Sequence, residues 1–88
     1  MSLEEVFSSK GRVKILKILV EIGELNISEI ARRSGLNYTT TNKHLQILEE
    51  TGLVRHKNFG RIRIFRFNEG SRRARMIKDL VDNWTVDK

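Results

Sequence analysis

Asn26–Phe67, which reads NISEIARRSGLNYTTTNKHLQILEETGLVRHKNFGRIRIFRF, is the stretch that decides the fold. Asn26 and Asn37 are of a residue type that favours helix starts, and each precedes a segment with helical spacing of its apolar residues. Gly35 separates the two segments. The pattern therefore predicts a helix-turn-helix over about residues 26–51.

Strand-like alternation follows these two helices. Strands are expected at Leu53–Asn58 and Arg61–Phe67, joined by a short glycine-containing turn. Alternation in the second strand places Phe65 and Phe67 on one face, which we expect to be the core face. The hairpin, at about residues 53–67, is rich in arginine and would form a basic wing beside the helices.

Helices are also expected on both sides of this stretch. Leu3, Val6 and Phe7 repeat at helical spacing, and a final helix is expected at about residues 71–84. Between them, Val13–Ile22 has apolar residues on two faces of a helix, so it must be covered on two sides. In so small a chain, the second cover is expected to be a partner subunit.

The order of these elements predicts an α+β fold that is mainly α. It consists of a three-helix core, a two-stranded β-wing and a C-terminal helix, which is the winged helix-turn-helix architecture. Leu25 can pair as a very short strand just before the first helix of the helix-turn-helix. The length of 88 residues predicts one domain over residues 1–88.

Positive charge is concentrated in one quarter of the chain. The formal net charge is +6, which suits a polyanionic partner. Between Thr51 and Arg75 there are eight cationic side chains and one acidic side chain, an excess larger than the net charge of the whole chain. A well-solvated surface is the alternative, but such surfaces usually intersperse both signs.

Composition argues against several other classes of protein. Cysteine is absent, so a disulfide framework and a thiolate metal site are excluded, and His44 and His56 are too few for a histidine metal cluster. Charges interrupt the longest apolar run, Ile15–Ile22, and the acidic N-terminus has no apolar core. No Ser–His–acid set or phosphate-cradling glycine loop suggests an enzyme. We expect a cytoplasmic protein with no metal, no cofactor and no membrane partner.

The second helix of the helix-turn-helix has a core side and a polar side. On a helical wheel Thr41, Leu45 and Leu48 cluster on the core side, and His44 at its edge is interpreted as structural. The opposite side offers the amide, hydroxyl and ammonium groups that bind base edges in a major groove, although a face that merely meets water is the alternative. The predicted base-reading residues are Tyr38, Thr39, Thr40, Asn42, Lys43 and Gln46.

Cations of the wing and of the first helix of the helix-turn-helix are expected to contact the DNA backbone. Arg61 follows the turn, so it should project from the hairpin tip, where an arginine can enter a narrow A·T minor groove. The other cations are better placed for phosphates. For Arg63 and Arg66, the alternative is charge that blunts an exposed edge strand. The predicted backbone or minor-groove residues are Arg32, Arg33, Arg55, Lys57, Arg61 and Arg63.

The final helix has one apolar stripe, with spacing i, i+3, i+4 and i+7. Together with the apolar residues near the N-terminus, this stripe could build a two-fold interface between two copies of the chain. The alternative is that the helix closes the core of its own domain. The predicted dimer-interface residues are Leu3, Val6, Phe7, Ile77, Leu80, Val81 and Trp84.

The segment SEIARRSGLNYTTTNKHLQILEETGLV, residues 28–54, resembles the helix-turn-helix of ArsR-type winged-helix regulators. That family shows a similar succession of E-I/L-A, L-G-L, T-V-S-x-H-L and L-E-x-x-G-L-V. The flanking FSSKGRVKIL and GRIRIF also lie where members have comparable segments, so the resemblance spans nearly the whole chain. It implies a homodimer, held by the N- and C-terminal helices, that represses or activates transcription at a palindromic operator.

The sequence departs from the family pattern in two ways. Thr41 stands where the family usually has an apolar residue, so looser packing is expected there. Many ArsR-type proteins sense metals through sets of cysteine or histidine, and this chain has no such set. Metal sensing is therefore not carried over.

The function that these features predict is sequence-specific binding of double-stranded DNA by a dimeric transcriptional regulator. The second helix of the helix-turn-helix would read the major groove, and the wing would hold the flanking backbone. One alternative is a nonspecific nucleoid- or RNA-binding protein. Another is a winged-helix adaptor between proteins, although its recognition surface would be expected to expose apolar or acidic residues.

Overall fold

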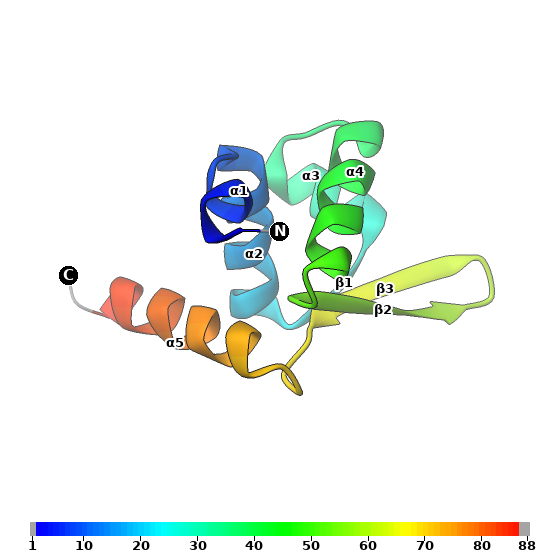
Figure 1. The fold of residues 1–88 in the computed structure, drawn as a ribbon. Helices are drawn as coiled ribbons and strands as arrows, with labels where there is room; N and C mark the ends of the chain where they lie inside the picture. The colour runs from blue at the N-terminus through cyan, green and yellow to red at the C-terminus, as the bar shows by residue number, and fades with distance from the viewer. Residues whose placement is uncertain (1, 87–88) are drawn as a thin grey trace.

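A computed structural model describes residues 2–86 of the chain, and Met1 and residues 87–88 lie outside this range. The helices and strands follow one another in the order predicted for a winged helix-turn-helix (Figure 1). They are α1 (Leu3–Phe7), α2 (Lys10–Ile22), β1 (Glu24–Asn26), α3 (Ile27–Ser34), α4 (Tyr38–Glu50), β2 (Val54–Phe59), β3 (Ile62–Phe67) and α5 (Arg72–Val86).

The start of each core helix is set by a polar side chain. The Asn26 amide oxygen accepts a hydrogen bond from the backbone N–H of Glu29 at 2.8 Å, and Asn37 does the same for Thr40 at 2.8 Å. Gly35 ends α3 in the left-handed region at a φ of 73°, which glycine adopts without strain. These local signals fix the length of both helices and the turn between them.

The three strands form one antiparallel sheet in the order β1-β3-β2. Leu25 and His56 both pair with Phe65, from opposite sides of β3. The wing is thus a two-stranded hairpin whose base is extended by β1, as the expected short strand at Leu25 implied. Because β3 is the central strand, the alternative that Arg66 blunts an exposed edge is wrong; Arg66 pairs with Glu24 on β1.

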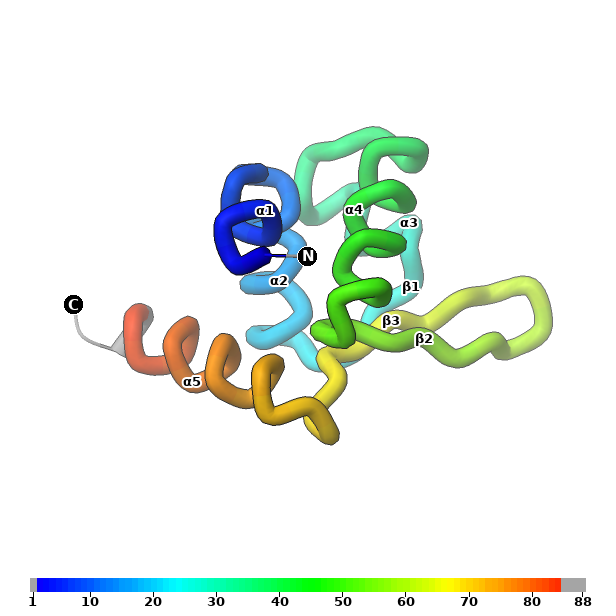
Figure 2. The backbone as a smooth tube through the Cα atoms, viewed as in Figure 1, coloured from blue at the N-terminus to red at the C-terminus, as the bar shows by residue number. Residues whose placement is uncertain are grey.

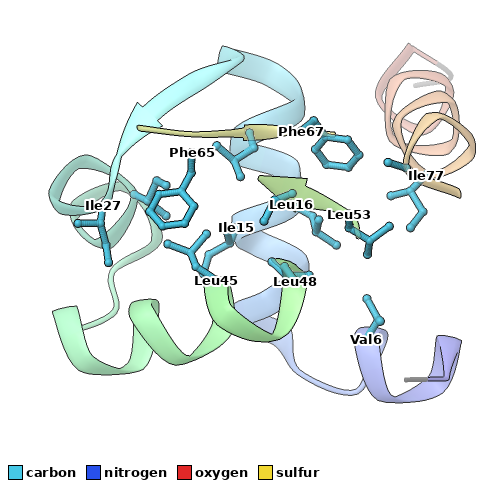
Figure 3. Close-up of a cluster of buried hydrophobic side chains, with 14 residues drawn as sticks. Val6, Ile15, Leu16, Ile27, Leu45, Leu48, Leu53, Phe65, Phe67 and Ile77 are labelled. Carbon is cyan, nitrogen blue, oxygen red and sulfur yellow. The ribbon is translucent and has the colours of Figure 1, made fainter. Parts of the chain in front are cut away.

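The helices and the sheet enclose one apolar cluster (Figure 3). Phe65 and Phe67 point into it from β3, as the strand alternation predicted, and Leu45 and Leu48 enter from α4. Burying a side chain of this size stabilises the fold by roughly 1.5–3 kcal/mol. The remaining members of the cluster are Val6, Ile15, Leu16, Leu19, Ile27, Ile30, Leu53, Val54, Ala74 and Ile77.

The core accommodates Thr41 on α4. Its side chain is fully buried, and its hydroxyl donates a 2.8 Å hydrogen bond to the carbonyl of Asn37. The bond satisfies the polar atom within α4, so a hydroxyl is tolerated where an apolar residue was expected. The looser packing expected at Thr41 stays a prediction.

The backbone tube shows that the wing and α5 leave the helical body in opposite directions (Figure 2). α2 contacts α3, α4 and α5, so it is the helix around which the others are arranged. None of the helices in the described part of the chain is long and apolar enough to cross a membrane.

Candidate nucleic-acid interface

The outer face of α4 presents most of the predicted base-reading residues. Four of the six are exposed, whereas Thr40 and Asn42 are half-buried. The first turn of α4 contains no acidic residue, so nothing there repels an approaching phosphate or base edge. The four exposed residues are Tyr38, Thr39, Lys43 and Gln46.

Asn42 is tied to the wing. The guanidinium of Arg63 donates a 2.8 Å hydrogen bond to the amide oxygen of Asn42, and it lies 5.5 Å from the centre of the Phe65 ring. A guanidinium has donors only, so it is the oxygen of Asn42 that faces it. The NH₂ group of Asn42 is thereby left as the group available to a ligand. Arg63 is half-buried, and it serves as a bridge between β3 and α4.

The wing itself is cationic along its whole length. Arg55 and Lys57 are exposed on β2, and Arg61 is exposed in the turn between the strands. Arg66 differs from these, because it forms an ion pair of 3.3 Å with Glu24. The three exposed cations are those that remain available to phosphates.

The two arginines at the end of α3 are partly engaged by an acidic neighbour. Glu29 accepts hydrogen bonds of 2.8 and 2.9 Å from Arg32, and Arg33 lies 3.6 Å from the same carboxylate. These hydrogen bonds from Arg32 lower the pKa of Glu29 below its ordinary value. Both arginines are exposed, but a phosphate would have to compete with Glu29 for them.

The back of α4 is held against α2 by His44 and Arg12. The guanidinium of Arg12 donates to the Nδ1 atom of His44 at 3.3 Å, so that nitrogen must be an unprotonated acceptor. Burial of the ring and the neighbouring charge of Arg12 lower the pKa of His44. His44 is therefore structural, as interpreted from the sequence. The partner of His44 could not be read from the sequence, because Arg12 lies 32 residues away.

The end of α4 is tied to the first strand of the wing. The His56 Nδ1 atom lies 2.6 Å from a carboxylate oxygen of Glu49, and the His56 ring is tilted against Phe65 at a centroid distance of 5.2 Å. This contact fixes the hairpin at its base. In the sequence, His56 stood out only as one of two histidines, too few for a metal cluster; the acidic residue seven positions earlier was the available signal for its contact.

The predicted dimer-interface residues fall into two groups. Val6 and Ile77 are only 4% and 7% exposed and belong to the core of their own chain, so they have little surface left for a partner. Leu3, Phe7, Leu80 and Trp84 are exposed, with Trp84 at 75%, and Val81 is half-buried. An apolar groove of about 310 Å³ also lies between α1, α2 and α5; it is lined by Phe7, Val13, Lys17, Leu80, Val81 and Trp84.

Among the described residues there is no group of three or more His, Cys, Asp or Glu side chains that could hold a metal ion.

The fold, the exposed polar helix and the basic wing define a winged helix-turn-helix protein. The chain belongs to the arsR family of bacterial regulatory proteins, whose family model matches residues 9–56, more than half of the sequence. It is therefore a DNA-binding transcriptional regulator, as the resemblance in the sequence implied. No curated protein shows a significant sequence match to the chain.

Three solved structures illustrate the likeness. Reduced HlyU from Vibrio cholerae has a TM-score of 0.79 and 22% identity, covering 93% of this chain and 83% of that one. The transcriptional repressor BigR from Xylella fastidiosa has a TM-score of 0.79 and 24% identity, covering 96% and 81%. The homodimeric winged helix-turn-helix DNA-binding domain of Mb0332 from Mycobacterium bovis has a TM-score of 0.76 and 26% identity, covering 94% and 74%. Because HlyU and BigR are less than 25% identical to this chain, their likeness shows the fold alone.

Proposed function

We propose that the chain acts as a dimer that binds a specific double-stranded DNA sequence, with α4 in the major groove and the wing on the flanking backbone and minor groove. The observation that supports this most directly is the hydrogen bond between Arg63 and Asn42. It fixes a cationic hairpin beside the exposed polar face of α4, so both surfaces would meet one duplex together.

The reading residues would differ in what they recognise. Gln46 and Lys43 are exposed and can reach base edges, with glutamine suited to adenine and lysine to guanine. Asn42 would recognise a different kind of base atom, because Arg63 engages its oxygen and leaves its NH₂ group to donate. It would therefore donate to an acceptor such as guanine O6 or thymine O4.

The backbone contacts would come mainly from the exposed cations of the wing. Each phosphate that a cation neutralises steepens the decrease of log K with log salt concentration by about 0.9. Arg55, Lys57 and Arg61 from each of two protomers would therefore contribute a slope of roughly −5 if all six contact phosphates. Arg32 and Arg33 would add less, because Glu29 already occupies them.

The dimer would form through α1, α5 and the groove between them. The homodimeric state of the Mb0332 domain supports this arrangement, and so does the exposure of Trp84 beside an apolar groove. A two-fold dimer would place its two recognition helices in half-sites about 34 Å apart, which is one turn of DNA.

Selection of bound sequences from a random DNA pool tests the proposal. The expected result is a palindrome, with an affinity at least about 10³-fold above that for unrelated DNA. Gln46→Ala should lower that ratio by roughly tenfold. Arg75→Gln on α5 is the matched control, because Arg75 bonds the carbonyl of Glu69 and lies outside the proposed interface. Uniform affinity for all duplexes would instead support a nonspecific nucleoid-binding role.

Dimer formation can be followed through Trp84, the only tryptophan in the chain. If α5 pairs with its symmetry mate, dilution should shift the fluorescence emission to longer wavelength as Trp84 becomes exposed to water. Leu80→Glu should give the dilute spectrum at every concentration and should sediment as a monomer. An emission spectrum that is independent of concentration, together with a monomeric sedimentation coefficient, would rule out the dimer.

A further inference from the structure

The tip of the wing carries two large apolar side chains that the core does not use. Phe59 is 61% exposed and Ile62 is 53% exposed. The two residues are paired directly across the hairpin, and such partners have Cβ atoms about 4.5–5.5 Å apart. They therefore form one continuous apolar patch. Figure 1 shows the hairpin extending beyond the helices, so this patch lies far from the core.

A two-residue turn holds Arg61 between the two apolar residues. Gly60 has a φ of 62°, and no other residue of the turn has a positive φ. This matches a type II′ turn, in which glycine occupies the first central position. The tight turn places the exposed guanidinium of Arg61 at the same end of the hairpin as Phe59 and Ile62.

The charge around the patch indicates the class of partner. The wing from Val54 to Phe67 contains five cations and no acidic residue. A surface that is cationic along its sides and apolar at its tip matches a nucleic-acid groove, which has phosphates at its rims and sugar C–H groups along its walls. Apolar side chains are known to enter the minor groove in this way.

We propose that Phe59 and Ile62 flank Arg61 as an apolar anchor in the DNA minor groove, where they contact deoxyribose and base edges. The inference rests on the proposed function. The apolar anchor would add a contribution to affinity that salt does not weaken. Arg61 would bind the acceptors on the groove floor, and the two apolar side chains would exclude water on either side of it.

The test separates apolar from ionic contributions through the salt dependence of binding. Phe59→Thr combined with Ile62→Thr places two residues of high strand propensity at a cross-strand position that favours Thr–Thr pairs. This double variant should bind the selected duplex roughly tenfold or more weakly at every salt concentration, with an unchanged slope. Arg61→Gln should instead make the slope less steep, because its guanidinium would no longer displace cations from the groove.

Two further variants show that the patch itself matters. Phe59→Leu combined with Ile62→Val keeps the tip apolar and should retain wild-type affinity. Ile22→Gln removes an exposed apolar side chain at the end of α2, away from the wing, and should have no effect on binding. The variants at Phe59 and Ile62 should unfold at the wild-type temperature, because neither residue is buried.

Base substitutions in the flanking DNA locate the contact. A G·C pair places the guanine amino group in the minor groove, whereas an inosine·cytosine pair does not. Wild-type affinity should fall with G·C flanks and be retained with inosine·cytosine flanks, and this difference should shrink in the double threonine variant.

Each other outcome overturns the inference. If the double threonine variant binds like the wild type, the apolar anchor is refuted while the proposed function stands. If the wild type binds no duplex, the proposed function fails and the inference with it. The anchor is equally refuted if DNA binding is unchanged while the variant loses self-association or loses binding to phosphatidylserine vesicles.

Discussion

Replacement of Gly11 by alanine should destabilise the protein, although alanine is the better helix former. Gly11 is the second residue of α2. A Cβ atom at this position would lie 2.9 Å from the His44 Nε2 atom and 3.2 Å from a methyl group of Leu36. The first distance is shorter than a real Cβ contact allows, so the ring of His44 would have to shift away from residue 11.

The two opposing effects differ enough in size to decide the sign. Alanine gains about 0.5–1 kcal/mol over glycine within a helix, and the lower end applies at the second position. Inserting a methyl group into a packed site costs typically 1–3 kcal/mol. The net loss should be about 1–2 kcal/mol, which lowers the melting temperature by roughly 4–8 °C per kcal/mol in a domain of this size.

A double-mutant cycle with His44→Ala provides the assay. Urea unfolding at one fixed protein concentration gives the free energies of the wild type, both single variants and the double variant. Once the ring is gone, Gly11→Ala should become neutral or stabilising, because only the contact with Leu36 remains. A Gly11→Ala effect of the same sign and size in both backgrounds, with coupling below about 0.5 kcal/mol, would refute the steric argument.

Three further predictions concern the contacts that hold α4. Arg63→Met keeps an apolar stem on Phe65 but releases Asn42, so selection from a random pool should show relaxed preference at one base position; an unchanged consensus would contradict this. Asn37→Ala should cost about 1 kcal/mol of stability by removing the helix cap, and Asn37→Asp should restore it. Because the pKa of His44 is lowered in the fold, the unfolded chain binds a proton more readily. The contribution of neutral His44 to the stability of the fold is therefore present in full above the ordinary pKa of 6.5. It is lost as the pH falls below that value. His44→Gln should therefore reduce the stability difference measured between about pH 7.5 and 5.5.

The elements and the core were predictable because their signals are local. The caps at Asn26 and Asn37 act on residues three positions away, and the sequence shows both of them. The burial of Leu45, Phe65 and Phe67 follows from helix and strand periodicity, which identifies the face that turns inward.

Periodicity cannot say what an apolar face packs against. The stripe on α5 correctly marked one side of that helix, but its first member, Ile77, enters the core of its own chain while Trp84 lies open to solvent. Val6 on α1 is buried in the same core. The distinction depends on the angle at which α5 leaves the wing, which no local pattern in the sequence encodes.

The side-chain contacts of the recognition surface were unpredictable for a related reason. Arg63 was assigned to the DNA backbone because it is a cation on a strand, yet its position places it beside Asn42, 21 residues earlier. Its partner is determined by the way the hairpin folds back along α4. A charged residue in a sequence shows that a partner is needed, and only the chain path shows whether that partner lies within the protein.

Three polar contacts outside the apolar core hold α4, each from a different side. Arg63 ties its second turn to the wing, His56 ties its end to β2, and Arg12 reaches its back from α2. The same guanidinium of Arg12 also donates to the carbonyls of Glu5 and Val6, at the end of α1. One side chain thus joins the first helix, which we place in the dimer interface, to the helix that would read DNA. A recognition helix fixed in this way loses little freedom on binding, so more of its contact energy remains as affinity.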